Sequence, residues 1–193
     1  MTDDAEIGLV ARAQAGDTRA FAALVRQYQN RVFRFILRLS ANREDAMDLT
    51  QETFMKAHQA LPAWQPQAQF RTWLLRIAHN TTLDLLRRRQ RVRFVPYGEL
   101  AADEQDPALP DPAPQPDELL ADRQNIRLLD LALRELPIEH REILLLRELE
   151  DLSYAEIAAT LDIAEGTVKS RLARARAAAL AAYQRHVGAP HDD

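Results

Sequence analysis

The stretch that most constrains the fold of this chain is residues 96–116, which holds six prolines and five acidic residues but no lysine or arginine. Proline interrupts helices and strands, and a segment of this composition buries too little apolar surface to form a core. We therefore expect a flexible, acidic, proline-rich linker here. Because the linker lies near the middle of 193 residues, we expect two small domains, residues 1–95 and 117–193.

The first domain shows helical periodicity throughout, with recognisable stop signals between the helices. Apolar residues recur every three or four positions and predict helices over residues 5–15, 18–39, 43–61 and 71–93, with residues 40–42 breaking the second helix from the third. Gly16 ends the first helix, Asp17 and Asn42 have the chemistry of N-caps, and Pro62 ends the third helix. On that third helix we expect a core face of Met47, Phe54 and Ala57.

The second domain is predicted to be helical as well, which makes the fold class all-α. One helix is expected over residues 117–136, and another begins at Pro137, a favourable first residue, and runs to residue 149. Residues 152–180 then predict two helices joined by a tight turn at residues 162–164. Ser153 and Glu156 have the spacing of a capping box at the start of the first of these helices.

The last helix has two faces of different chemistry. Its apolar face consists of Val168, Leu172, Ala175 and Ala179. The opposite face is small, polar and basic, and comprises Lys169, Ser170, Ala173 and Arg174, flanked by Arg171 and Arg176. A slim basic helix after a tight turn suits the major groove of DNA, where phosphates attract cations and base edges are exposed. An ordinary solvated helix is the alternative, and the combination of features favours a C-terminal helix-turn-helix that binds DNA.

Composition limits the other classes of function. The net charge is only -4, so affinity for DNA must come from local basic surfaces. The chain contains no cysteine, long apolar run or basic N-terminal leader, and we expect a cytoplasmic protein without a metal or other cofactor. The histidines do not suggest a catalytic cluster, because they are scattered along the chain at positions 58, 79, 140, 186 and 191.

Two features of the first domain have more than one interpretation. Asp45, Asp48 and Glu52, with Gln51 beside them, recur at helical spacing and form either a solvated acidic face or a docking face for a basic partner helix. The loop at residues 61–70 contains Trp64 and Phe70 among glutamines, which suits stacking on exposed bases, although both rings could instead pack onto the helices. An arginine-rich run at residues 87–93 favours a track for phosphates.

Taken together, nearly the whole chain resembles the extracytoplasmic-function sigma factors, small members of the bacterial sigma family. In the first domain, DAMDLTQETF (residues 45–54) resembles the segment that grips the β′ clamp helices of RNA polymerase. FRTWLLRIAHN (residues 70–80) and the following DLLRRR resemble the promoter-melting and -10-binding segment. In the second domain, LPIEHREILLLRELEDLSYAEIA (residues 136–158) and EGTVKSRLARAR (residues 165–176) resemble the -35-binding domain.

The resemblance implies roles for individual residues. It implies that the -35 element is contacted by the recognition helix through Thr167, Lys169, Ser170, Arg171, Ala173, Arg174 and Arg176, with Thr167, Arg171 and Arg176 toward phosphates. For the -10 element it implies Trp64, Phe70, Asn80, Arg87 and Arg88. For core polymerase it implies the segment that contains Asp45, Asp48, Gln51, Glu52 and Phe54.

The function implied is promoter-specific initiation of transcription by a subunit that is not itself an enzyme. Its expected partners are the β′ clamp helices and β flap of core RNA polymerase, promoter DNA, and an anti-sigma factor that hides these faces. A conventional repressor or activator is one alternative, and it predicts tight promoter binding by the protein alone. A DNA-processing enzyme is the other, and it lacks a candidate catalytic cluster.

Overall fold

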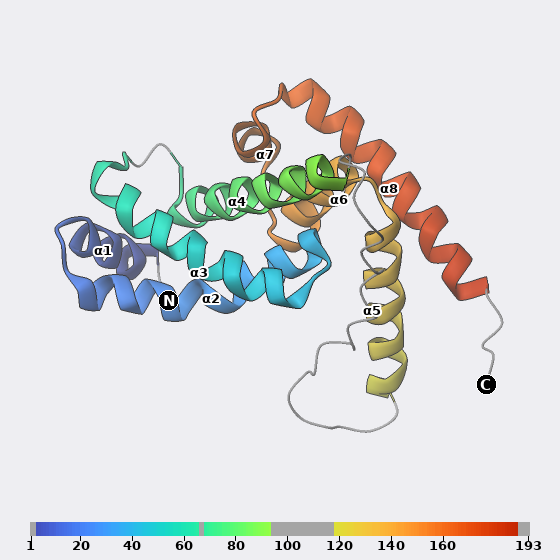
Figure 1. The fold of residues 1–193 in the computed structure, drawn as a ribbon, viewed down its shortest axis with the longest axis horizontal. Coiled ribbons are helices and arrows are strands. Elements are labelled where there is room, and N and C mark those ends of the chain that lie inside the picture. Colours follow the sequence, from blue (N-terminus) through green and yellow to red (C-terminus); the bar gives the residue numbers. More distant parts are fainter. Residues whose placement is uncertain (1–2, 66–67, 94–117, 189–193) are drawn as a thin grey trace. The chain divides into compact units, whose positions relative to one another are not determined.

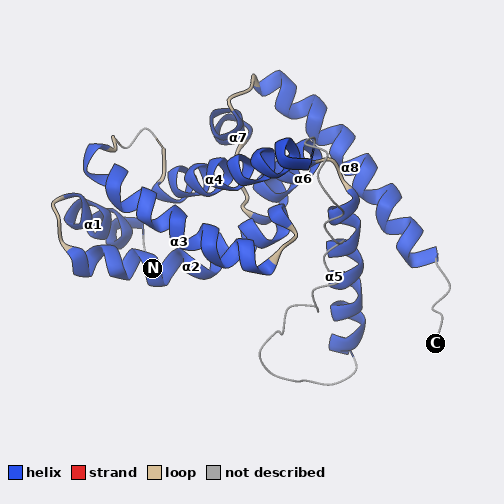
Figure 2. Ribbon diagram, viewed as in Figure 1, coloured by secondary structure: helices blue, strands red, loops and turns tan. Residues whose placement is uncertain are grey.

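The computed structural model describes residues 3–65, 68–93 and 118–188, and within these ranges the chain forms helices and loops but no strand (Figures 1 and 2). The all-α prediction is therefore confirmed. The predicted linker at residues 96–116 and the histidine at position 191 lie outside the described residues. In chain order the elements are α1 (Asp3–Gln14), α2 (Thr18–Ser40), α3 (Arg43–Ala60), the 3-10 turn η1 (Leu61–Ala63), α4 (Phe70–Arg93), α5 (Glu118–Glu135), α6 (Ile138–Leu144), the π-helical turn η2 (Leu145–Leu149), α7 (Tyr154–Leu161) and α8 (Glu165–Gly188).

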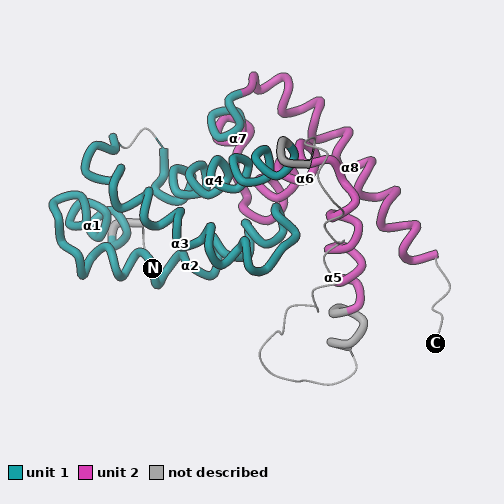
Figure 3. Tube along the Cα trace, in the orientation of Figure 1, with its two compact units in different colours: residues 1–97, 158–162 teal, residues 98–157, 163–193 magenta. Residues whose placement is uncertain are grey.

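The chain divides into two compact units, residues 1–97 with 158–162 and residues 98–157 with 163–193 (Figure 3). Both domain limits predicted from the sequence, residues 95 and 117, lie outside the described ranges. The two units are described separately below.

The first unit is a bundle in which α2 packs against α1, α3 and α4. Burial of large aliphatic side chains away from water is the main stabilising contribution to such a bundle. The largest of the fully buried side chains in this unit are Leu24, Ile36, Leu39, Leu61, Leu74 and Leu75.

The breaks between the first three helices follow from local chemistry. Gly16, two residues after the end of α1, has a φ of +92°, a conformation that glycine adopts without strain. The helical course of α1 therefore stops here. The carboxylate of Asp17 accepts hydrogen bonds from the backbone N–H groups of Arg19 and Ala20, so it caps α2. The side chain of Asn42 likewise accepts from the N–H of Asp45 and caps α3. Both predicted caps are confirmed.

The third helix shows one clear difference from the prediction. Phe54 and Ala57 are buried as expected, but the side chain of Met47 is not in the core, and 59% of the residue is exposed. The inward position in the first turn is taken instead by Asp45, which is 9% exposed. The prediction placed the apolar methionine inside because it could not foresee that the carboxylate of Asp45 is held by Arg89, which is distant in sequence.

In the second unit, α8 packs against α5 and α6. Arg141 links α6 to the C-terminal end of α5. Its guanidinium donates hydrogen bonds to the C=O groups of Leu133, Arg134 and Leu136. The burial of this side chain lowers the pKa of Arg141. The largest fully buried side chains of the unit are Ile143, Leu145, Leu146, Leu152, Ile157 and Leu172.

The helix expected from Pro137 to residue 149 is not uniform. It is α-helical only to Leu144 and ends in the π-helical turn η2, which inserts an extra residue per turn and rotates the side chains that follow. On α5, Leu133 is buried, whereas Ile126 and Leu129 are 51% and 43% exposed.

Candidate nucleic-acid interface

The predicted helix-turn-helix is present, and its first helix begins with a complete capping box. The Ser153 hydroxyl lies 3.3 Å from the N–H of Glu156, and the Glu156 carboxylate accepts from the N–H and the hydroxyl of Ser153 at 2.9 and 2.7 Å. After α7, Asp162 adopts a left-handed conformation with φ of +55°, and α8 begins three residues later at Glu165. A tight turn of this kind is what sets the entry of the second helix.

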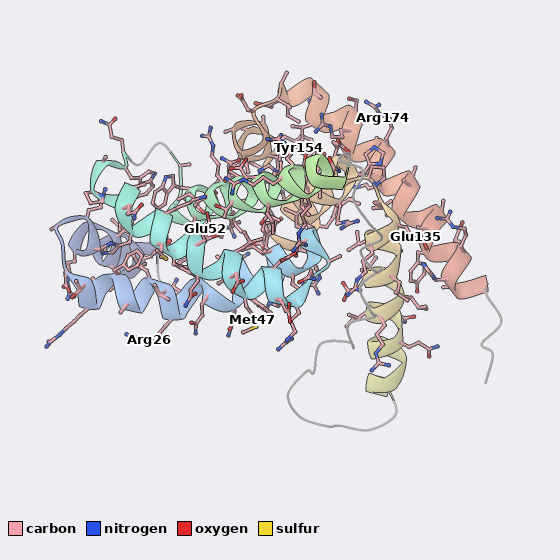
Figure 4. All side chains as sticks on the ribbon, in the orientation of Figure 1. Arg26, Met47, Glu52, Glu135, Tyr154 and Arg174 are labelled. Atoms are coloured by element: carbon pink, nitrogen blue, oxygen red, sulfur yellow. The ribbon has the colours of Figure 1, made fainter. Side chains whose placement is uncertain are left out.

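The two faces of α8 divide as the sequence predicted. Val168, Leu172 and Ala175 are buried, and Ala179 is half-buried. Lys169, Ser170, Ala173 and Arg174 are exposed, and Thr167 is half-buried (Arg174 is labelled in Figure 4). These four exposed residues combine two cations with two small side chains, a combination that suits the major groove of DNA.

Two other arginines of α8 are bound within the second unit. Arg171 is 25% exposed at its side chain, and its Nη1 lies 3.5 Å from Oε1 of Glu142, a side chain only 6% exposed. Arg176 donates two hydrogen bonds to Glu148 of η2, at 3.0 and 2.7 Å. These hydrogen bonds raise the pKa of Arg176, which therefore stays charged at any physiological pH.

Sequence reasoning did not find these glutamate partners. A signal for Glu142 was present, because it is followed at once by the apolar run of residues 143–146, and a glutamate in a buried helix needs a cationic partner. For Glu148 there was no such signal, since its position depends on the extra residue of η2. Beside it, the guanidinium of Arg147 lies 5.5 Å from the centre of the Tyr154 ring and donates to the C=O of Leu152.

In the first unit, the aromatic residues of the loop at residues 61–70 belong to a ring cluster. Phe70 is the first residue of α4 and is 4% exposed, with its ring centre 5.6 Å from those of Tyr28 and Trp73. Trp64 is half-buried and lies 5.2 Å from Trp73. Gln14 fixes this loop from α1, because its amide donates to the C=O groups of residues 61 and 64.

The ring of Phe70 packs onto the bundle beside Trp64 and is 4% exposed, as one of the two interpretations of the loop expects. Contact of Phe70 with a DNA base stays a prediction. The ring of Trp64 stays partly accessible, and its contact with DNA stays a prediction.

Further along α4, the predicted polar positions lie on the surface. Asn80, Arg87 and Arg88 are exposed. The side chains of residues 91 and 93, which belong to the same arginine-rich run, lie outside the described part of the chain. Arg89 is different, because the two terminal nitrogens of its guanidinium group, Nη1 and Nη2, donate to the carboxylate of Asp45.

The acidic residues of α3 lie at the predicted helical spacing but differ in exposure. Asp48, Gln51 and Glu52 are exposed, and Glu52 forms an ion pair at 2.8 Å with Lys56 one turn later (Glu52 is labelled in Figure 4). Asp45 is the exception, because its side chain is 11% exposed and is held by Arg89. Contact with polymerase stays a prediction for all four residues.

A groove of about 770 Å³ runs beside this acidic face, between α2 and α3. Phe21, Val25 and Phe33 of α2 line it, together with Met47, Phe54 and Met55 of α3. Asp48 and Gln51 also line this groove. Phe54 is 8% exposed, whereas the two methionines are 59% and 62% exposed, so their thioethers form a soft apolar surface (Met47 is labelled in Figure 4). The sequence prediction missed this groove because it placed Met47 in the core.

Neither a metal centre nor a transmembrane helix is present in the part of the chain that the structure describes. Over residues 3–65, 68–93 and 118–188, no group of three or more histidine, aspartate or glutamate side chains is arranged to hold a metal ion. In the same ranges no helix is both long enough and apolar enough to cross a membrane.

Comparison with known proteins gives matches in both halves of the chain. Residues 24–92 match the family model for sigma-70 region 2, and residues 126–178 match that for sigma-70 region 4. Among solved structures, that of CnrH in complex with the cytosolic domain of CnrY has a TM-score of 0.64 and 28% identity, and the match covers 92% of this chain and 96% of that one.

Curated relatives match over most of the chain. The ECF RNA polymerase sigma factor SigE of Mycolicibacterium smegmatis is 42% identical over 79% of this chain, which spans 57% of that relative's length. The RNA polymerase sigma-H factor of Pseudomonas aeruginosa is 37% identical over 92% of this chain and 93% of its own. The ECF RNA polymerase sigma-E factor of Haemophilus influenzae is 36% identical over 91% and 92%. The protein belongs to the extracytoplasmic-function family of RNA polymerase sigma factors.

Proposed function

We propose that this chain binds core RNA polymerase and directs initiation at promoters whose -35 and -10 elements it contacts with its two helical domains. One observation supports this most strongly: region 2 and region 4 follow one another along the chain, and the residues matched to each expose a surface of suitable charge. The chain would supply positioning and DNA binding in the cytoplasm, with no bond-making chemistry of its own, while polymerase supplies catalysis.

At the -35 element, the exposed face of α8 enters the major groove. Lys169 and Arg174 reach base edges as hydrogen-bond donors, with Ser170 as a short polar partner and Ala173 allowing close approach. Arg176 and Thr167 lie toward phosphates. Since its ion pair with Glu148 is exposed at both ends, Arg176 exchanges the carboxylate for a phosphate at little cost. Arg171 supports the helix from within through Glu142.

At the -10 element, the exposed part of the first unit combines one accessible ring with basic side chains. Trp64 stacks on an unpaired base while Phe70 and Trp73 hold it from below. Asn80 contacts the same strand, and Arg87 and Arg88 bind phosphates of the adjoining duplex. Such a site stabilises bases that have left the stack and so favours opening of the duplex.

Core polymerase is bound by the α2–α3 groove and the acidic residues beside it. A helix of the β′ clamp places apolar side chains in the groove against Met47, Met55 and Phe54. Its basic side chains pair with Asp48 and Glu52, while Gln51 supplies neutral hydrogen bonds. The second domain contacts the β flap.

The two domains act together because the linker at residues 96–116 joins them. When polymerase binds the first domain, the second is held at a high effective concentration near the -35 element, so two modest affinities combine. An anti-sigma factor would compete for these same faces. The related CnrH, solved in complex with the cytosolic domain of CnrY, is a precedent for a protein partner.

Selection of DNA from a random library tests this proposal. Core polymerase with the protein should enrich sequences that share two short elements at a constant separation, whereas core alone and protein alone should enrich neither. Enrichment of a single element by the protein alone, unchanged by core, would contradict the proposal.

A further inference from the structure

A two-point ion pair in the first unit joins two helices to which the proposed function gives different roles. Asp45 lies in the first turn of α3, the helix that presents the polymerase-binding residues, and its backbone N–H is bound by the side chain of Asn42. Arg89, 44 residues later in sequence, donates from Nη1 to Oδ2 at 2.5 Å and from Nη2 to Oδ1 at 2.7 Å. This two-point fork fixes the orientation of both groups as well as their distance.

The pair lies where α4 has little else to hold it. In its first half α4 is anchored by buried residues such as Leu74, Leu75 and Ala78. Further along, Leu85 and Leu86 are only half-buried, and residues 87–90 are all exposed. The end of a helix with few buried contacts frays readily. Arg89 is therefore the anchor nearest the C-terminal end of α4 among the residues whose side chains the structure describes.

The geometry of a helix then decides where the neighbouring arginines lie. Successive residues are rotated by about 100°, so with Arg89 turned toward α3, Arg87 is on roughly the opposite side of α4 and Arg88 on its flank. Both are exposed. If the fork opened, this part of α4 would lose its fixed direction.

We propose that Asp45 and Arg89 are positioning residues for promoter DNA: their fork holds the C-terminal turns of α4 so that Arg87 and Arg88 are presented to the -10 duplex. This inference rests on the proposed function of α4. It gives Asp45 a role inside the protein in place of a contact with polymerase. It also means that the charge of Arg89 is committed to Asp45 rather than to a phosphate.

The test uses the full chain assembled with core polymerase, with Asp45→Asn, Arg89→Gln and the double variant. Asp45→Asn keeps the shape of the side chain, Arg89→Gln shortens it but keeps a neutral polar end, and both remove the charge. We expect each single variant to slow promoter opening, followed by permanganate reactivity of the -10 strand, about three- to tenfold. The double variant should lose no more than the worse single, because either change breaks the same fork. Affinity for core should stay within about twofold of the unaltered protein, within the range of non-interacting sites.

Arg12→Gln is the matched control. It removes the arginine of the exposed Arg12–Asp17 ion pair in the same unit and should leave the rate of promoter opening unchanged. Arg89→Lys keeps the charge but not the fork and should open promoters at an intermediate rate. Thermal unfolding of every variant shows whether it is folded, and if Asp45→Asn is not, the Arg89→Lys result decides.

Three results would overturn the proposal. Faster opening or tighter DNA binding by Asp45→Asn, with weaker binding by Arg89→Gln, would mean that Arg89 is itself a DNA ligand. A loss of core affinity in Asp45→Asn would restore Asp45 as a polymerase contact. Additive losses in the double variant would mean that the residues act independently. Failure of the unaltered protein to open any promoter would instead count against the proposed function.

Discussion

Replacing Arg171 by methionine separates a structural role for this arginine from a role in binding phosphate. In the structure its Nη1 lies 3.5 Å from Glu142, and the two side chains are 25% and 6% exposed. Methionine retains the length of the apolar stem and removes the charge, so Glu142 would lose one cationic partner at a buried site.

The expected loss of stability lies between two known limits. Breaking a fully buried pair by removing one partner costs about 3–5 kcal/mol. An exposed pair contributes about 0–1 kcal/mol. Because Glu142 is buried and Arg171 is partly exposed, we expect a loss of about 2 kcal/mol in the free energy of unfolding of the second unit. For a unit of this size that corresponds to a decrease of roughly 8–16 °C in its melting midpoint.

The assay combines thermal unfolding by circular dichroism with the salt dependence of promoter binding by the assembled holoenzyme. Far-ultraviolet signal is needed, because Trp64 and Trp73 both lie in the first unit and do not report on the second. Below its melting midpoint, Arg171→Met should bind with an unchanged salt slope. Arg174→Met is the matched control, since this arginine is exposed and should alter binding without lowering the midpoint. An unchanged midpoint for Arg171→Met, with a salt slope reduced by about one, would refute the reasoning.

Three further predictions concern other parts of the chain. Charge reversal by Asp48→Lys with Glu52→Lys should weaken binding of core polymerase about tenfold or more at unchanged helicity, measured by titration with labelled core, and unchanged affinity would remove this face from the interface. Arg174→Ala should cost about 1–3 kcal/mol and relax preference at particular -35 positions, measured on a promoter panel, whereas a uniform loss on all promoters would indicate a phosphate contact. The hydrogen bonds from Arg12 and the helix N-terminus hold the pKa of Asp17 below its ordinary value of 3.8. The stabilisation that Asp17 gives over Asp17→Asn, which keeps the cap, should be present at neutral pH and disappear as the pH falls through the lowered pKa. A difference in melting midpoint that persists in strong acid would contradict it.

The helix caps and the apolar face of α8 could be predicted from the sequence, because each depends on residues only a few positions apart. The caps at Asp17 and Asn42 and the capping box at Ser153 each depend on groups within three positions of one another. The apolar face of α8 was equally predictable, since Val168 and Leu172 recur with the helical period and are buried.

Ion pairs between residues distant in sequence could not be predicted, and they account for the differences between the predicted and the observed site. Asp45 and Met47 are two residues apart on α3 and point in nearly opposite directions, so only one can face the core. Hydrophobicity alone places Met47 inside, but Arg89 provides Asp45 with a partner 44 residues away and reverses the order. Burial of Glu142 against Arg171 has the same cause. In both cases the carboxylate points inward because of an arginine on another helix, and helical spacing gives no information about that contact.

Run-off transcription from a genomic promoter library, reconstituted from core polymerase with and without this protein, tests the central claim most directly. We predict that the protein adds transcripts from a small set of promoters, that these promoters share a -35 and a -10 sequence, and that the free protein binds the same DNA weakly and with little selectivity. Tight, selective binding of single promoters by the free protein, with no new transcripts when core is supplied, would contradict the account and identify a conventional regulator instead.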